Sequence, residues 1–218
     1  MKSIAAFAFL SLAFSPAATV PTAAATRDKQ LEMAACLFQK HPGNVDRLLN
    51  AKTAQDADHA FYNLINESGC YRQVFGGNPG DEDEDVKMTM GTMRGLFAEQ
   101  ELRKSAAAAR ALASLPQQRI YVRPWFVGTA RAQVVDEMGA CIADTNPAGI
   151  LALLEQPPES AGEDSALKAL EPSVDACLPK DVQINATHRQ VRAALADALY
   201  QRVNAPTLSY SEIVETPR

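Results

Sequence analysis

One pattern of residues occurs twice in this chain of 218 residues, at a constant separation of 105 positions. Residues 32–36 read EMAAC, and residues 137–141 read EMGAC. A proline and three aliphatic residues follow at the same separation: Pro42, Val45, Leu48 and Leu49 in the first copy, and Pro147, Ile150, Leu153 and Leu154 in the second. A second cysteine closes each copy, Cys70 in the first and Cys177 in the second. A chain that contains one unit twice is expected to fold both copies alike, so this repeat limits the possible folds more than any other feature.

Apolar residues recur at helical spacing in both copies, which predicts an all-α fold made of two pseudo-repeats of about four helices each. We expect helices at about 28–39, 45–49, 53–65 and 86–115 in the first copy, and helices ending at about 143, 154, 170 and 203 in the second. Thr53 and Asp56 form a capping box at the start of the third helix, and residues 68–70 are expected to end it. Pro116 and Pro172 are expected to stop helices, because proline lacks an amide hydrogen and clashes with the preceding turn.

The fourth helices of the two copies align at a shorter separation of 98 positions, since Arg94 matches Arg192 and Phe97 matches Leu195. The first copy must therefore contain extra residues, which we assign to the acidic loop 76–85. The resulting plan is a signal peptide at 1–25, a first helical repeat at 26–116, a second helical repeat at 117–204 and an extended tail at 205–218.

The first 25 residues have the pattern of a secretory signal peptide. Lys2 supplies a positive charge, residues 4–14 form an uncharged apolar run, and alanines at 23–25 suit a signal peptidase. An uncleaved anchor helix is the alternative, but the run is shorter than the roughly 20 apolar residues that span a bilayer. We therefore expect a periplasmic or secreted protein without a transmembrane segment in the mature chain.

Four cysteines in an exported chain indicate two disulfides. Three pairings are possible, and the repeat favours Cys36 with Cys70 and Cys141 with Cys177, because a duplicated unit carries its own bridge. Each bridge closes a loop of about 35 residues, which the chain-entropy account values at ~4 kcal/mol. A zinc site is disfavoured because no two cysteines have the short C-x-x-C spacing.

The stretch 119–127, which reads RIYVRPWFV, joins the two copies and has no counterpart in the repeat. It contains the only tryptophan, Trp125. The favoured interpretation is an aromatic wedge that fills the junction between the copies. The alternative is an exposed surface of Arg123, Trp125 and Phe126 that binds a protein partner.

The net charge of −5 lacks the basic footprint of a nucleic-acid-binding protein, so no nucleic-acid partner is expected. The histidines, His41, His59 and His188, are far apart and suit surface or capping roles. No nucleophile elbow, zinc-protease motif, phosphate-binding loop or dinucleotide fingerprint is present. These features favour a non-catalytic protein and predict no cofactor.

Two groups of residues are weak candidates for metal binding. Met90 and Met93 lie one helical turn apart and could bind Cu(I) through their thioether sulfurs, although core packing is the favoured role. The acidic run contains Asp81, Asp83 and Asp85, which could hold Ca²⁺ loosely, although a solvated loop is the favoured interpretation.

The function expected from the sequence is that of a non-catalytic exported helical protein that binds a protein partner or acts as an envelope factor. A hydrolase or other enzyme with a cleft between the two repeats is an alternative, because clefts between related halves often hold ligands. A weak Cu- or Ca-binding periplasmic protein is a further alternative. Arginines, histidines and carboxylates gathered in a cleft would favour the enzyme, whereas an exposed Trp125 would favour the binding protein.

Overall fold

The computed structural model describes residues 23–77, 88–180 and 182–204, with the backbone alone for residues 23–28. Within these ranges the chain forms ten α-helices, one 3₁₀-helix and no β-strand, which confirms the predicted all-α fold. The elements are α1 (Ala23–Lys40), α2 (Pro42–Leu49), α3 (Ala54–Ile65), α4 (Ser68–Phe75), α5 (Met90–Lys104), α6 (Ala106–Arg110), η2 (Pro124–Gly128), α7 (Gln133–Thr145), α8 (Pro147–Leu154), α9 (Ala161–Cys177) and α10 (His188–Asn204).

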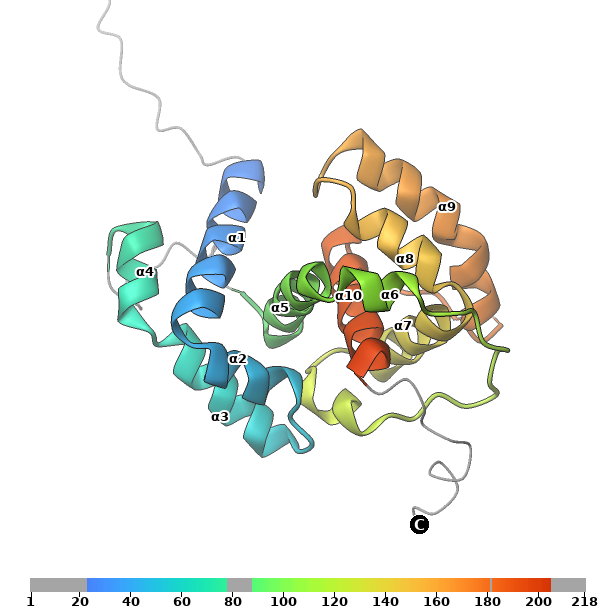
Figure 1. The fold of residues 1–218 in the computed structure, drawn as a ribbon, viewed down its shortest axis with the longest axis horizontal. Coiled ribbons are helices and arrows are strands. Elements are labelled where there is room, and N and C mark those ends of the chain that lie inside the picture. The colour runs from blue at the N-terminus through green and yellow to red at the C-terminus, as the bar shows by residue number, and fades with distance from the viewer. Residues whose placement is uncertain (1–22, 78–87, 181, 205–218) are drawn as a thin grey trace, which may run out of the picture.

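Helices α5 and α10 pack against each other at the centre of the molecule (Figure 1). On one side, α1 and α2 pack against α5, and α3 and α4 lie outside them. On the other side, α7 and α8 pack against α10, and α9 lies outside them. Where the central helices meet, a Cβ added at Gly95 would overlap the Cα and Cβ atoms of Ala193. The glycine therefore allows the two backbones to approach more closely than a side chain would permit.

The structure contains two disulfides, Cys36–Cys70 and Cys141–Cys177, which are the pairs expected from the sequence. The first links α1 to α4, and the second links α7 to α9. The Cα atoms of each pair are 5.7 Å apart, within the usual range for a cystine. Each bridge holds a peripheral helix against a helix that packs on the central pair.

The start of α3 agrees with the sequence, but its end does not. Thr53 caps the helix, because its hydroxyl oxygen accepts a hydrogen bond from the Asp56 amide at 3.1 Å. The prediction that residues 68–70 end this helix is wrong, since α3 ends at Ile65 and Ser68 begins α4. The side chain of Glu67 caps α4 by accepting from the Gly69 amide at 2.9 Å. Cys70 thus lies within a helix of its own.

Helix α9 continues through Pro172, where the sequence predicted an end at about residue 170. The proline cannot donate to the carbonyl of Lys168, but both residues are exposed, so water can satisfy that carbonyl. Cys177 is consequently the last residue of α9, and the predicted turn at this cysteine is wrong.

The predicted long helix at 86–115 is also wrong in its length. Helix α5 ends at Lys104, the backbone departs from helical geometry at Ser105, and α6 covers only Ala106–Arg110. The hydroxyl of Ser105 donates to the carbonyl of Glu101 at 3.0 Å, a local bond that competes with helix continuation. From residue 113 to residue 123 the chain has no helix, so Pro116 lies beyond the end of α6 and is not the residue that ends the helix.

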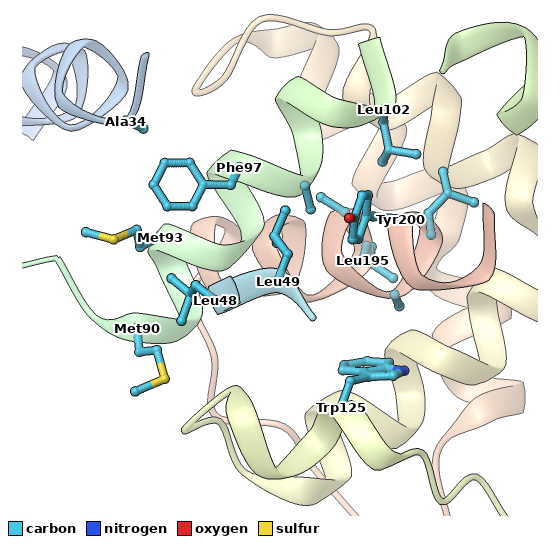
Figure 2. Close-up of a cluster of buried hydrophobic side chains, with 14 of the residues drawn as sticks. Ala34, Leu48, Leu49, Met90, Met93, Phe97, Leu102, Trp125, Leu195 and Tyr200 are labelled. Carbon is cyan, nitrogen blue, oxygen red and sulfur yellow. The ribbon is translucent and has the colours of Figure 1, made fainter. Parts of the chain in front are cut away.

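Buried side chains from both sides of the central pair form one continuous core. Figure 2 shows part of it, with side chains of Leu48 and Leu49 from α2, Phe97 from α5, Leu195 from α10 and Trp125 from η2. Phe97 and Leu195, the residues that matched in the sequence, are both fully buried. The helices on the two sides therefore do not form separate cores.

Three of the segments assigned from the sequence fall mainly outside the described residues. They are the signal peptide at 1–25, of which residues 23–25 begin α1, the acidic loop at 76–85, of which Gly76 caps α4 with a positive φ of 80°, and the tail at 205–218. Among the described helices, none is both long and apolar enough to cross a membrane.

Candidate functional site

A fully buried arginine, Arg94, joins the two central helices. Its Nε and Nη2 atoms donate to the two carboxylate oxygens of Asp197 on α10, at 2.8 and 3.1 Å. Its Nη1 and Nη2 atoms also donate to the carbonyls of Leu48 and Leu49, the latter at 3.1 Å. The last carbonyls of a helix lack partners within that helix, so Arg94 both caps α2 and pairs with a charge on α10.

A second buried arginine, Arg192 on α10, makes the corresponding contacts on the other side. Its Nε and Nη2 atoms donate to the carboxylate of Glu99 on α5, at 3.1 and 2.7 Å. Its Nη1 and Nη2 atoms donate to the carbonyls of Leu153 and Leu154, at 3.1 and 3.2 Å. It has one further partner, because Nη1 also donates to Glu163 of α9 at 3.0 Å.

The two arrangements are reciprocal. Each central helix supplies an arginine that caps the short helix on its own side and binds a carboxylate of the other central helix. The capped leucines are 105 positions apart, and both the arginines and the acids are 98 positions apart. Burying a charge without partners is very unfavourable, so Arg94, whose carboxylate partner Asp197 lies on α10, depends on the other central helix, whereas Arg192 also has Glu163 on its own side.

Arg131 extends this network on one side only. It donates to Asp197 at 2.6 Å, to Asp136 at 2.7 Å and to the carbonyl of Gly91 at 2.9 Å, while Thr129 donates to Asp136 at 2.5 Å. Burial alone would raise the pKa of Asp197, but the charges of Arg94 and Arg131 hold it below its ordinary value. For Asp136, burial outweighs the attraction of Arg131, and its pKa is raised.

The segment 119–127, which the sequence predicts to be the junction, is anchored by three inward side chains, Tyr121, Arg123 and Trp125. The hydroxyl oxygen of Tyr121 accepts from the Gln118 amide at 2.9 Å, and Arg123 donates to Asp144 of α7 at 3.3 Å. Trp125 is 8% exposed, which agrees with the wedge interpretation. The alternative surface made of Arg123, Trp125 and Phe126 needs correction, because the first two side chains are buried and Phe126 is half-buried.

The outward side chains of the same segment are large and apolar. Ile120 and Val122 are 64% and 56% exposed and alternate with the buried Tyr121 and Arg123, as expected for extended backbone. Val127, at the end of η2, is 53% exposed. A groove of about 570 Å³ borders this surface, between residues 117–121, α7 and the end of α9.

Beneath the junction lies a small cavity of about 70 Å³, between the junction residues, α7 and α10. Arg202 of α10 closes one side of it by donating to the carbonyls of Ala143, Asp144 and Ala113. Its Nε atom makes no hydrogen bond and lies 3.5 Å from a carboxylate oxygen of Asp144. Burial raises the pKa of Asp144 despite the neighbouring Arg123 and Arg202, and burial lowers the pKa of Arg202.

The histidines do not approach one another or the buried network. His41 lies 3.3 Å from Glu67 and His188 lies 3.4 Å from Asp164, both at the surface, and His59 is exposed on α3. Among the described residues, no group of three histidine, cysteine or acidic side chains is placed to hold a metal ion.

The candidate copper ligands Met90 and Met93 are buried core residues of α5 (Figure 2). The candidate calcium ligands Asp81, Asp83 and Asp85 lie outside the described residues.

Sequence reasoning missed the charged residues of the interior. Arg94 and Arg192 match each other in the sequence, but neither their burial nor their pairing with the acids Glu99 and Asp197 was predicted. A useful signal was available, because these acids repeat at the same separation of 98 positions as the arginines. Arg131, Asp144 and Arg202 have no such signal, since they belong to contacts made on one side only.

No known protein family, curated protein or solved structure shows significant similarity to this chain. The function must therefore be argued from the site itself.

Proposed function

We propose that this protein is a non-catalytic exported binding protein, built from two copies of a helical unit, which binds a protein partner through the outward face of its junction. This face comprises Ile120, Val122 and Val127 and is called the junction surface below. The observation that carries the proposal is its exposure: three large aliphatic side chains lie open to solvent within eight residues of one segment. Clustered exposed apolar side chains are typical of surfaces that bind other proteins.

The anchoring of the segment supports this role. Tyr121, Arg123 and Trp125 fix its backbone from below, through the Asp144 ion pair and the aromatic packing of Trp125 with Phe126 at 4.6 Å between ring centroids. A surface that is already ordered loses little conformational entropy when a partner binds. The same contacts keep Ile120 and Val122 pointing outward.

The chemistry of the interior supports a binding protein rather than an enzyme. The buried carboxylates Glu99, Asp136 and Asp197 are each held by arginine at hydrogen-bonding distance, where they stabilise the helix packing. Perturbed pKa values also arise in structural ion-pair networks, so those of Asp136 and Asp197 are explained without catalysis.

The duplication is supported by the reciprocal arginine contacts and by the two disulfides, each of which joins the first cysteine of one copy to its second cysteine. Export is supported by the signal-like pattern at residues 1–25 and by the disulfides, which persist in oxidising compartments. A protein partner suits the junction surface, because the chain is acidic overall and the exposed side chains are aliphatic.

The test is capture of partners from the extracytoplasmic fraction of the native organism, with the double variant Ile120→Asp/Val122→Asp compared with wild type. Tyr62→Asp is the matched control, since Tyr62 is 63% exposed and lies on α3, outside the segment 119–127. We expect the same partner to be retained by wild type and by Tyr62→Asp and to be lost from the double variant. A partner retained equally by all three proteins would reject the junction surface.

Sedimentation of the purified protein completes this test. Because an apolar patch can also bind a second copy of the same chain, a dimer that Ile120→Asp/Val122→Asp dissociates would reassign the surface to self-association.

A further inference from the structure

Two depressions in the molecular surface are built from matching positions of the two halves. One is a groove of about 660 Å³ beside α1, α4 and α5, and the other is the cavity of about 70 Å³ beneath the junction. The groove is lined by Ala35, Phe38, Gln39, Gln100 and Lys104, and the cavity by Ala140, Ala143, Asp144, Ala198 and Arg202. In order, the first three pairs are 105 positions apart and the last two are 98 positions apart.

The two depressions differ in volume because only one of them is covered. Residues 113–125 lie over the second, where Arg202 donates to the carbonyl of Ala113 and the Leu115 amide donates to the carbonyl of Asp144 at 2.7 Å. Leu115 and Trp125 line the cavity from above. None of the described residues covers the first depression in this way. This depression is called the α1–α5 groove below.

The covering segment follows the central helix of the opposite half. After α5 the chain first passes α8, where Arg110 of α6 binds Glu155 at 2.9 Å. The covering segment then reaches the end of α7. The corresponding segment is the one that follows α10, residues 205–218. At the separation of 98 positions, Leu112 and Leu115 match Tyr210 and Ile213, so the large apolar residues are kept.

The position of α10 makes this path possible. Gln201, in the last turn of α10, donates to the carbonyl of Leu49 at the end of α2. The end of α10 thus lies beside α2, just as α6, which follows α5, lies beside α8 in the other half. The eight residues of α2 extend about 12 Å from there to Pro42, which lines the α1–α5 groove. Fourteen extended residues span about 45 Å, so residues 205–218 have ample reach.

We propose that residues 205–218 dock in the α1–α5 groove, as residues 113–125 cover the corresponding cavity. Ile213 packs against Ala35 and Phe38 in place of the Lys104 ammonium, which lies 4.0 Å from the centroid of the Phe38 ring. Lys104 then donates to a main-chain carbonyl, as Arg202 does to that of Ala113. The inference rests on the duplication in the proposed function, but it is independent of the junction surface.

The test is site-specific photo-crosslinking in the full chain, with benzoylphenylalanine in place of Ile213. We expect intramolecular crosslinks to peptides of α1, α4 or α5, identified by mass spectrometry. Ala35→Trp fills the groove from an exposed position and should abolish these crosslinks. Ala169→Trp, an equally large change at an exposed position of α9, should leave them unchanged.

A second measurement uses a chain that ends at Asn204 and a fluorescent peptide of residues 205–218. We expect the peptide to bind the truncated chain, and we expect binding to be lost with Ile213→Asp in the peptide and with Ala35→Trp in the chain. Crosslinks elsewhere, crosslinks only between two molecules, or no crosslinks would overturn the proposal. None of these outcomes concerns Ile120 or Val122, so the partner-binding proposal stands or fails separately.

Discussion

Asp197→Asn should destabilise the protein strongly, because it removes the charge that balances a fully buried arginine. The substitution keeps the size of the side chain, so it creates no cavity. Arg131 keeps Asp136 as a partner, at 2.7 Å. Arg94, however, loses the negative charge and one of its two side-chain acceptors, because an asparagine amide has a single oxygen; the carbonyls of Leu48 and Leu49 remain.

The magnitude follows from the burial of the pair. Both side chains have 0% exposure, so water cannot replace the lost partner. Breaking a buried ion pair by removing one charge costs about 3–5 kcal/mol, whereas an exposed pair contributes about 0–1 kcal/mol. We therefore expect the free energy of unfolding of Asp197→Asn to fall by about 3–5 kcal/mol at pH 7.

Glu99→Gln is the matched control, because it removes the corresponding charge from the other half. Arg192 retains Glu163 at 3.0 Å after this change, and Arg103, which also binds Glu99 at 3.1 Å, is exposed to solvent, so no buried arginine is left without a carboxylate. The loss of stability should be clearly smaller than for Asp197→Asn. Chemical denaturation followed by far-ultraviolet circular dichroism measures both values.

The pH dependence of stability shows whether Asp197 stabilises the fold through its charge or through the shape of its side chain. The folded pKa of Asp197 is lowered, so its stabilising contribution is complete above an ordinary aspartate pKa of about 4 and is lost as the pH falls through the folded value. The gap between wild type and Asp197→Asn should therefore shrink in acid. Equal losses of stability for Asp197→Asn and Glu99→Gln would refute the argument that Arg94 depends on a single carboxylate and Arg192 on two. A stability difference between wild type and Asp197→Asn that does not change with pH would refute the role of the Asp197 charge.

Three further predictions concern other parts of the fold. Trp125→Ala should lower stability by about 3–5 kcal/mol, as truncation of buried aromatic residues does, and native emission of Trp125 should be blue-shifted and move to the red on unfolding. Gly95→Val should lower stability by at least about 1–3 kcal/mol in chemical denaturation, because its side chain would overlap Ala193. The folded pKa of Asp144 is raised, so wild type should lose stability relative to Asp144→Asn as the pH rises from about 4 through that folded value; melting temperatures measured in buffers that span this window check the sign.

Features that depend on local signals were predicted from the sequence. The two disulfides followed from the repeated spacing, and the start of α3 followed from the hydroxyl of Thr53 three residues before Asp56. The short helices α2 and α8 followed from a proline before three aliphatic residues at helical spacing. Each of these features is determined by residues close together in the sequence, or by a repeat that can be read directly.

Features that depend on distant contacts were not predicted. The run of alanines at 106–109 favours a continuous helix, but the chain leaves α5 at Ser105 and crosses to α8 on the other side. The continuation of α9 through Pro172 depends on an exposed surface that local propensity does not specify. Arg94 was not expected in the interior, because arginine is rarely buried and its acidic partner lies on another helix.

The reciprocal ion pairs explain why two copies of one unit would remain a single folded body. In an isolated half, Arg94 or Arg192 would lack the carboxylate supplied by the other central helix, and Gly95 would face no Ala193. The residues that form the contacts between the two central helices are thus ones that match at a constant separation of 98 positions. Two positions that differ between the halves line the depressions, where the exposed Gln39 and Lys104 correspond to the buried Asp144 and Arg202. The ion pairs between the central helices do not involve these four residues, so the two depressions can differ in what they bind without any change in the contacts that hold the halves together.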